Sequence, residues 1–187
     1  STTVQGAKIG YEAIKGFDRH DSTSVENPKE LAPKERYTIG IPRQFLGEGL
    51  SGEIRSVVED VVAKLEREGH TIVRDIDIQL LDQSIAIYYL IMAAEVSANL
   101  ARYDGIRFGL HGQDVIDSRA RGFGPEVKRR IMLGTFALSA GYADKYYKRA
   151  QAARAALRKA LLSVLDQVDF IFGPVTPELP FKFGAKT

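Results

Sequence analysis

The spacing of hydrophobic residues in the first part of the chain predicts a helix, a loop and a strand. Apolar residues recur at helical spacing within residues 3–15, and Gly16 ends that segment. Residues 17–34 are rich in Asp, Ser, Pro and Glu, so we expect an exposed loop there. Residues 37–41 read Tyr-Thr-Ile-Gly-Ile, which is typical of a short strand, and Pro42 closes it.

The next segment has the pattern of a helix followed by a second strand. Ser51 is placed to cap the helix, and Gly69 to end it. Thr71–Ile76 is the second strand. Two strands joined by one helix within about forty residues predict a parallel pair with a right-handed crossover. The apolar stripe of the helix comprises Ile54, Val57, Val58, Val61, Val62 and Leu65.

A long helix is predicted over Leu80–Arg102. Its stretch Ile85–Ala94 is apolar on nearly every side, which predicts burial between layers. Glu95 and Asn99 follow on the same helix, and polar groups on a buried helix need partners, so we expect them to bond a neighbouring backbone or to line a cleft. The pair Tyr88-Tyr89 inside the apolar stretch is expected to pack, with one hydroxyl hydrogen-bonded.

The stretch 121–149 predicts a glycine-rich turn, a helix, a bend near Gly141 and a further helix. Pro125 suits the first helical position because its missing N–H is not needed there. The further helix runs from Tyr142 to about Gln167. Val168–Phe172 is a short apolar strand, for which we expect a central position in a covered sheet. The fold class is therefore α/β, with helices packed on a mainly parallel, mixed sheet.

Helical geometry separates the three consecutive cations at 128–130. Val127, Ile131, Gly134 and Leu138 share the packing face, and Arg129 points away from it. Lys128 and Arg130 flank that face on opposite sides, and Arg130 lies nearer its centre, so it is the cation best placed to reach a cleft. Two roles are open from spacing alone: a bidentate bond to a carboxylate, or a local pair with Glu126 on a solvated flank.

Composition limits the classes of function. The chain has 187 residues, which fits a single domain, and 44% hydrophobic with 27% charged residues is typical of a globular protein. A net charge of +2 gives no strong field toward nucleic acid or membrane. No cysteine is present, which excludes disulfides and thiolate catalysis. No segment is long and apolar enough to span a bilayer, so we expect a cytoplasmic location.

Three local patterns imitate functional motifs. Residues 47–52 spell Gly-x-Gly-x-x-Gly, but they begin six residues after the strand, so a dinucleotide site is not expected. Residues 18–24 contain Asp, His and Ser, and a polar surface turn explains them better than a catalytic cluster. The three histidines, His20, His70 and His111, lack ligand spacing, so we expect no metal site.

Three sequence words resemble those of a known family. They are Asn-Leu-Ala-Arg-Tyr-Asp-Gly at 99–105, Gly-Phe-Gly-x-Glu-Val-Lys-Arg-Arg-Ile at 122–131 and Leu-Gly-Thr-Phe-x-Leu-Ser-x-Gly-Tyr at 133–142. They resemble the A subunits of glutamyl-tRNA(Gln)/aspartyl-tRNA(Asn) amidotransferases, which are amidase signature enzymes. The resemblance covers residues 5–184 and only a later part of the family's subunit. It implies a single partial amidase signature domain over residues 1–187.

The resemblance also implies a function and site residues. The family's A subunit hydrolyses glutamine, and partner subunits of a heterotrimer use the ammonia, with ATP and Mg, to amidate Glu-tRNA(Gln) or Asp-tRNA(Asn). Arg130 matches the arginine that receives the glutamine α-carboxylate, and Tyr88 matches a pocket tyrosine, although a shift by one residue selects Tyr89. The Ser, cis-Ser and Lys of catalysis match nothing here, so no catalytic residue and no cofactor is expected in this chain.

Two other functions stay open at this point. The first is a stand-alone amidase signature hydrolase, which the three sequence words argue against. The second is a non-catalytic binding or scaffold module, which remains possible because the segment that carries the family's nucleophile is not in these residues. Because of that same difference, we expect the 187 residues alone to hydrolyse no amide.

Overall fold

The structure is a computed structural model that describes residues 1–26 and 32–185. Residues 27–31 of the predicted loop lie outside the described residues. The chain divides into two compact units, Ser1–Glu35 and Arg36–Thr187. The first unit contains helix α1, Val4–Ile14, which confirms the predicted helix. The Thr3 side chain caps α1 by accepting a hydrogen bond from the Gly6 N–H, and no residue of α1 is buried.

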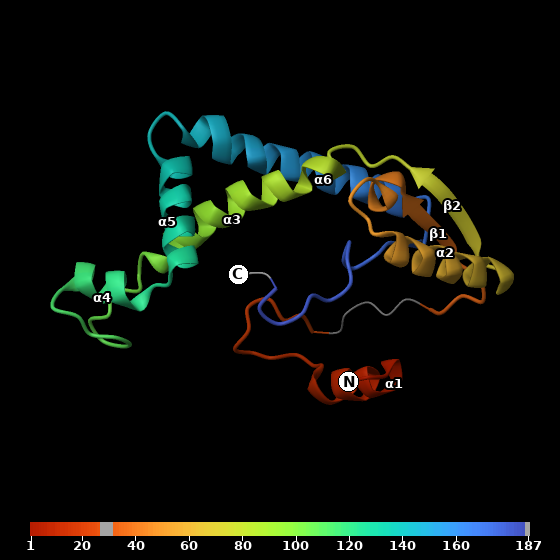
Figure 1. Cartoon of the computed structure of the whole chain (residues 1–187), viewed down its shortest axis with the longest axis horizontal. Coiled ribbons are helices and arrows are strands. Elements are labelled where there is room, and N and C mark those ends of the chain that lie inside the picture. The colour runs from red at the N-terminus through yellow and green to blue at the C-terminus, as the bar shows by residue number, and fades with distance from the viewer. Residues whose placement is uncertain (27–31, 186–187) are drawn as a thin grey trace. The chain divides into compact units, whose positions relative to one another are not determined.

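The second unit is a small parallel sheet covered by helices (Figure 1). Single helical turns precede two of the longer elements. A wide π-helical turn leads into the last helix. In chain order the elements are β1 Thr38–Pro42, a 3-10 turn Arg43–Leu46, α2 Gly52–Arg67, β2 Thr71–Ile76, a 3-10 turn Leu81–Gln83, α3 Ser84–Leu100, α4 Val115–Gly122, α5 Pro125–Leu138, the π-helix Ala143–Lys148, α6 Arg149–Leu165 and β3 Phe170–Ile171.

The sheet has the order β2-β1-β3, and both pairings are parallel. The predicted parallel pair joined by a helix is therefore confirmed, while no antiparallel strand occurs within 32–185. The expected central position of Val168–Phe172 is wrong, because β1 is the central strand. Ile171 packs with residues of α6, and Phe172 packs with residues of α2. Because these helices cover the two faces of the sheet, the run 168–172 is apolar although β3 lies at the edge of the sheet.

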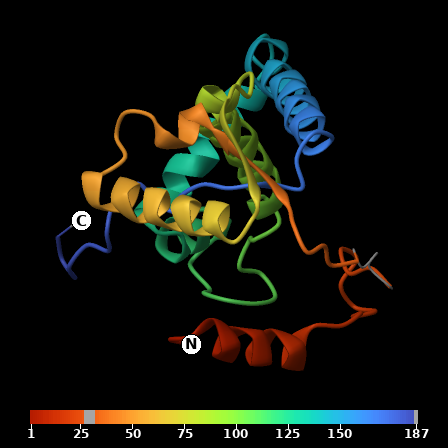
Figure 2. The same cartoon turned by 90° about the vertical axis from the view of Figure 1, so that its right-hand side faces the viewer.

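Helices α2 and α6 cover the two faces of the sheet (Figure 1, Figure 2). Val58 and Val62 of α2 are buried against Ile41 of β1. Val164 of α6 is buried with Val168 in a separate cluster on the other side. The Ser51 side chain accepts the N–H of Ile54, which confirms the predicted cap. The predicted stripe of α2 is too wide, because Val57 and Val61 are exposed.

The predicted long helix Leu80–Arg102 is interrupted at its start. Leu80 has a left-handed φ of 67°, and a 3-10 turn separates it from α3. Helix α3 packs on α5 and α6, and Ile87 and Ile91 are buried. The prediction of burial on nearly every side is wrong, since Ile85 is exposed. Two neighbouring helices cover two sides of α3 and leave a third side open.

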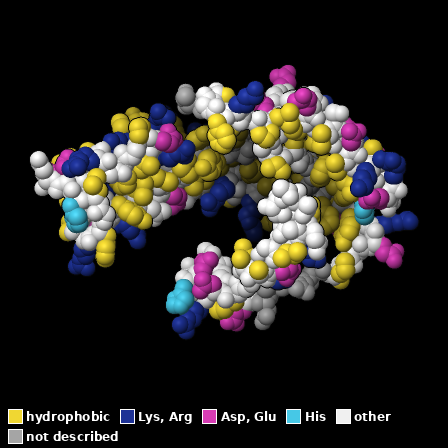
Figure 3. Space-filling view, turned by 60° about the horizontal axis from the view of Figure 1, so that its bottom comes forward, with side chains coloured by type: hydrophobic (Ala, Val, Ile, Leu, Met, Phe, Trp, Pro, Cys, Tyr) yellow, Lys and Arg dark blue, Asp and Glu magenta, His cyan; other side chains and the backbone are white. Residues whose placement is uncertain are grey.

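The second half of the unit follows the predicted order with one addition. Helix α4 was not predicted. Helix α5 begins at Pro125, as expected, and Gly141 makes the bend with φ of 83°. Ala150 and Val164 of α6 are buried. Hydrophobic side chains also lie on the surface (Figure 3); on α5 they are Met132, Leu133, Phe136 and Leu138.

Candidate functional site

Arg130 lies on α5, at the edge that packs toward α3. The Arg130 side chain is 26% exposed, whereas that of Arg129 is 69% exposed. Gly134, one turn further on, is buried against the Ala93 backbone and the Ser97 side chain of α3, so this face of α5 is fixed. The predicted orientation of Arg130 beside the packing face is confirmed. Arg129 points to solvent, as predicted.

The guanidinium of Arg130 has three neighbours. Its Nε lies 2.9 Å from Glu126 Oε1, and its Nη1 donates to Met92 Sδ at 2.9 Å. The guanidinium carbon lies 5.8 Å from the ring centroid of Tyr89. The local pair with Glu126 therefore exists together with the approach to α3. Nη2 has no partner among the described residues, so a carboxylate can still bind to this end of the guanidinium.

The two neighbouring tyrosines of α3 differ in their relation to Arg130. Tyr89 lies beside the guanidinium, and the Tyr88 ring lies edge-on to Tyr89 with 5.5 Å between centroids. Tyr88 and Tyr89 are 56% and 53% exposed, so neither is a core residue. The expectation that the pair is packed with one hydroxyl hydrogen-bonded is therefore wrong, because both side chains are more than half exposed. The structure brings Tyr89 to Arg130 and places Tyr88 one ring further away.

Glu95 connects the same face of α3 to the last helix. The Tyr147 hydroxyl donates to Glu95 Oε1 at 2.7 Å and accepts from Gln151 Nε2 at 3.0 Å. Because the hydrogen bond to the carboxylate favours the protonated phenol, the pKa of Tyr147 is raised. Residues at i, i+4 and i+7 share a helix face, so Glu95 lies in line with Tyr88 and Met92. The sequence indicated that Glu95 needed a partner but did not identify Tyr147.

Tyr147 belongs to the π-helix Ala143–Lys148, which the sequence did not predict. A π-turn contains one residue more than an α-turn, so it changes which side chains face a neighbouring helix. An aromatic group lies at this junction, with the Phe136 ring 4.5 Å from Tyr142 and Tyr142 stacked on Tyr146 at 5.8 Å.

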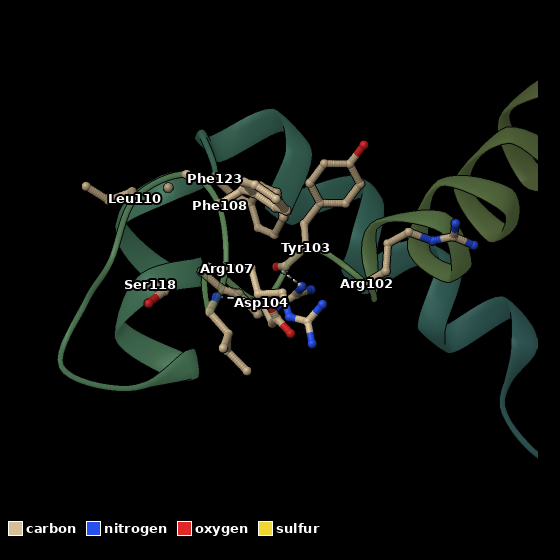
Figure 4. A pocket seen from close by; sticks show the side chains of 13 residues that line it. Arg102, Tyr103, Asp104, Arg107, Phe108, Leu110, Ser118 and Phe123 are labelled. Atoms are coloured by element: carbon tan, nitrogen blue, oxygen red, sulfur yellow. Dashed lines mark hydrogen bonds between the residues drawn. The ribbon is translucent and has the colours of Figure 1, made fainter. Parts of the chain in front are cut away.

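A large hollow lies away from Arg130 and Tyr88, which are not among its lining residues. It has a volume of about 740 Å³ and is formed by residues 102–110 together with Ser118, Arg119, Gly122 and Phe123 (Figure 4). It is open to solvent and has no cluster of acids or histidines. In residues 1–26 and 32–185, no group of three or more His, Asp or Glu side chains is close enough to hold a metal ion.

The Asp, His and Ser pattern at 18–24 has a structural explanation. In the turn at 18–24, the Asp18 carboxylate accepts the His20 N–H, and the Asp21 carboxylate accepts the N–H and hydroxyl of Thr23. This confirms a polar turn.

None of the helices within the described ranges has the length and apolar character needed to cross a membrane.

Comparison with known proteins decides the family. The amidase family model matches residues 1–187. The chain belongs to the amidase family. This amidase-family chain is 40% identical over 198 residues to the A subunit of glutamyl-tRNA(Gln) amidotransferase from Pseudomonas savastanoi pv. phaseolicola. It is 44% identical over 198 residues to the corresponding protein of Alkalilimnicola ehrlichii. In both cases the alignment covers 99% of this chain and 41% of the relative, so the chain spans about two fifths of these relatives.

Solved structures agree with this membership. The crystal structure of the glutamyl-tRNA(Gln) amidotransferase A subunit from Thermotoga maritima has a TM-score of 0.69 and 31% identity, covering 99% of this chain and 38% of that chain. A bacterial aryl acylamidase of the amidase signature enzymes has a TM-score of 0.65 over 89% of this chain and 34% of that chain. At 18% identity this second likeness concerns the fold alone. The resemblance to the A subunits is thus confirmed for this amidase-family chain.

Proposed function

We propose that this chain forms the carboxylate-binding wall of the glutamine site in the A subunit of a tRNA-dependent amidotransferase. The complete subunit would hydrolyse glutamine, and partner subunits would use the ammonia, ATP and Mg to amidate Glu-tRNA(Gln) or Asp-tRNA(Asn). The names of the relatives support the enzyme class. The observation that carries the residue assignment is the half-buried Arg130, held on two sides and with Nη2 available.

The contacts of Arg130 suit the recognition of an amino acid. Glu126 and Met92 fix the direction of the guanidinium without closing its outer end. A hydrogen bond between the Arg130 guanidinium and a substrate carboxylate would be stronger than one between neutral groups. Because Arg130 is partly buried, water competes less with the carboxylate for the guanidinium. The catalytic residues of the family match no residue here. We therefore propose that residues 1–187 alone bind one side of the substrate and do not cleave it.

The test is the glutaminase rate of the complete subunit with its partners, for wild type and Arg130→Ala. We expect kcat/KM for glutamine to fall about 100-fold, or about 3 kcal/mol, mainly through KM. Arg129→Ala is the matched control, because Arg129 also pairs with Glu126 but points to solvent. Amidation with free ammonia should be unchanged in both variants. A glutamine rate for Arg130→Ala within a few-fold of wild type would contradict the assignment.

The two tyrosines can be separated in the same assay. We propose Tyr88 as the pocket tyrosine on the basis of resemblance, while the structure places Tyr89 closer to Arg130. Tyr88→Ala should then raise the KM for glutamine more than Tyr89→Ala does. The reverse order would assign the pocket to Tyr89, which is the shift by one residue that the sequence leaves open.

A further inference from the structure

The loop that lines the hollow between residues 102 and 123 has a fixed conformation. Gly105 has φ of 75°, and a Cβ at this position would press on the Leu110 carbonyl and on the Ser118 side chain. The loop can therefore turn back on α4 only with glycine at this point. The Ser118 hydroxyl accepts the Gly112 N–H at 2.8 Å and donates to the Asp114 carbonyl at 2.8 Å. These contacts close one end of the loop.

Arg119 closes the other end of the hollow. Its Nη1 donates to the carbonyls of Leu100 and Tyr103, both at 2.8 Å, and its guanidinium lies 4.9 Å from the Phe123 ring centroid. These bonds tie α4 to the C-terminal end of α3. The wall of the hollow is consequently held by the chain itself, and a ligand would not have to order it.

Two arginines at the hollow have no such structural role. Arg102 and Arg107 both line it, and neither has a hydrogen-bond or ion-pair partner among the described residues. The one carboxylate in the lining, Asp104, already accepts the Ile106 N–H at 2.9 Å. Apolar side chains lie at the same hollow: Phe108 is 86% exposed and Ile106 is also exposed. The hollow therefore offers unpaired positive charge next to uncovered apolar surface.

We propose that this hollow is a docking site for an acidic segment of a partner protein, with an apolar side chain covering Phe108 and carboxylates reaching Arg102 and Arg107. Arginine and aromatic residues dominate the binding energy of protein interfaces, and charge complementarity selects the partner. A nucleic acid fits less well, because phosphate tracking needs a row of cations and, within the described chain, the lining offers only two unpaired ones, Arg102 and Arg107.

This inference rests on the proposed function, because the partners to be tested are the other subunits of the amidotransferase. The experiment measures the affinity of the complete A subunit for those subunits by titration calorimetry. We expect the double substitution Arg107→Glu with Phe108→Ser to weaken assembly at least about tenfold. Arg107→Lys, which keeps the charge, should weaken it less. Arg158→Glu is the control, because Arg158 is an exposed arginine of α6 outside the hollow.

Each outcome decides the proposal. An unchanged affinity in the double variant, or an equal loss in Arg158→Glu, would overturn it. Normal assembly combined with weaker tRNA binding would also overturn it and would assign the hollow to nucleic acid. Both Arg107 and Phe108 are exposed, so the fold should tolerate the changes; a circular dichroism spectrum like that of wild type checks this. If wild-type chain failed to bind the other subunits at all, the proposed function itself would fail.

Discussion

The arginine at the junction of α3 with α5 is held by neighbouring side chains, whereas Arg107 at the hollow beside α4 is held by none in the described chain. At the junction, Arg130 is partly buried and contacts Glu126, Met92 and Tyr89. At the hollow, Arg107 has no partner in the described chain and lies among exposed apolar residues. A guanidinium that is already oriented loses little entropy when it binds a small carboxylate. A free guanidinium on an open surface is better suited to a larger partner that brings its own contacts.

The helices at the two sites differ in how tightly they are attached to α3. Helix α5 lies so close to α3 that the packing leaves room only for the hydrogen of Gly134. Helix α4 is connected to α3 chiefly through the bonds of Arg119 and through its loop. A change at the junction should therefore affect both stability and the proposed glutamine site, while a change at the hollow should affect the proposed docking alone. The predictions below test that difference.

The largest effect is expected for Gly134→Ala. Its new methyl group would overlap the Ala93 backbone carbonyl and the Ser97 hydroxyl, and the carbonyl cannot move without displacing α3. We expect a loss of about 3 kcal/mol in the free energy of unfolding of the complete subunit, measured by denaturant titration. The KM for glutamine should rise as well, since Arg130 lies one turn away. The control is Gly122→Ala, where the added Cβ meets nothing within 4 Å; an equal loss there would contradict the argument.

A smaller effect is expected for Tyr147→Phe, which removes the hydrogen bond to Glu95. Since the pKa of Tyr147 is raised in the folded chain, this bond contributes fully below the ordinary tyrosine value of 10.0. Its contribution is lost as the pH rises through the raised value. Wild type should thus be more stable than Tyr147→Phe at pH 8, and the difference should shrink above pH 10. A difference that grows with pH would show that Glu95 is not the cause.

The smallest effect is expected on acidification, at the start of α4. The Asp117 carboxylate accepts the Gln113 N–H at 2.9 Å, which lowers its pKa from the ordinary 3.8. A lowered pKa means that the contribution is present above about pH 4 and is lost as the pH falls through the lowered value. The protection of the Gln113 amide against hydrogen exchange should then decrease in wild type as the pH falls below about 4, and should not change with pH in this way in an Asp117→Asn variant, which has no carboxylate to protonate. The protection of amides in α5 should stay unchanged, because that helix does not depend on Asp117.

The sequence predicted the ends of helices correctly where the end depends on the residue at that position. Ser51 caps α2 and Pro125 begins α5, because each satisfies a requirement of the helix end itself. The parallel pairing of β1 and β2 followed from the crossover rule. The order of the sheet did not follow, since whether a strand is central depends on which strands pair with it and not on its own composition. The interruption at Leu80 was also missed, as a left-handed leucine has no sequence signature.

The orientation of Arg130 could be predicted from the sequence, but the residues that it contacts could not. Periodicity separated Arg130 from Arg129, and the exposed fractions of their side chains confirm this. The contacts with Met92 and Tyr89 depend on how α5 crosses α3, which is a tertiary property. The assignment of Tyr88 to the pocket stays a prediction. The link between Glu95 and Tyr147 joins residues fifty-two positions apart, and no local pattern connects them.

The wide turn at Ala143–Lys148 has a consequence for comparing sequences within the family. Such a turn holds one surplus residue, so a homologue can lose it by a single-codon deletion and still continue α6 without a break. A deletion between Tyr142 and Tyr147 would rotate Tyr147 by about 100° relative to the residues before the turn and detach it from Glu95. We therefore expect one-residue gaps at this position to coincide with the loss of tyrosine at 147 or of glutamate at 95. An alignment of the family would show the two changes inherited together.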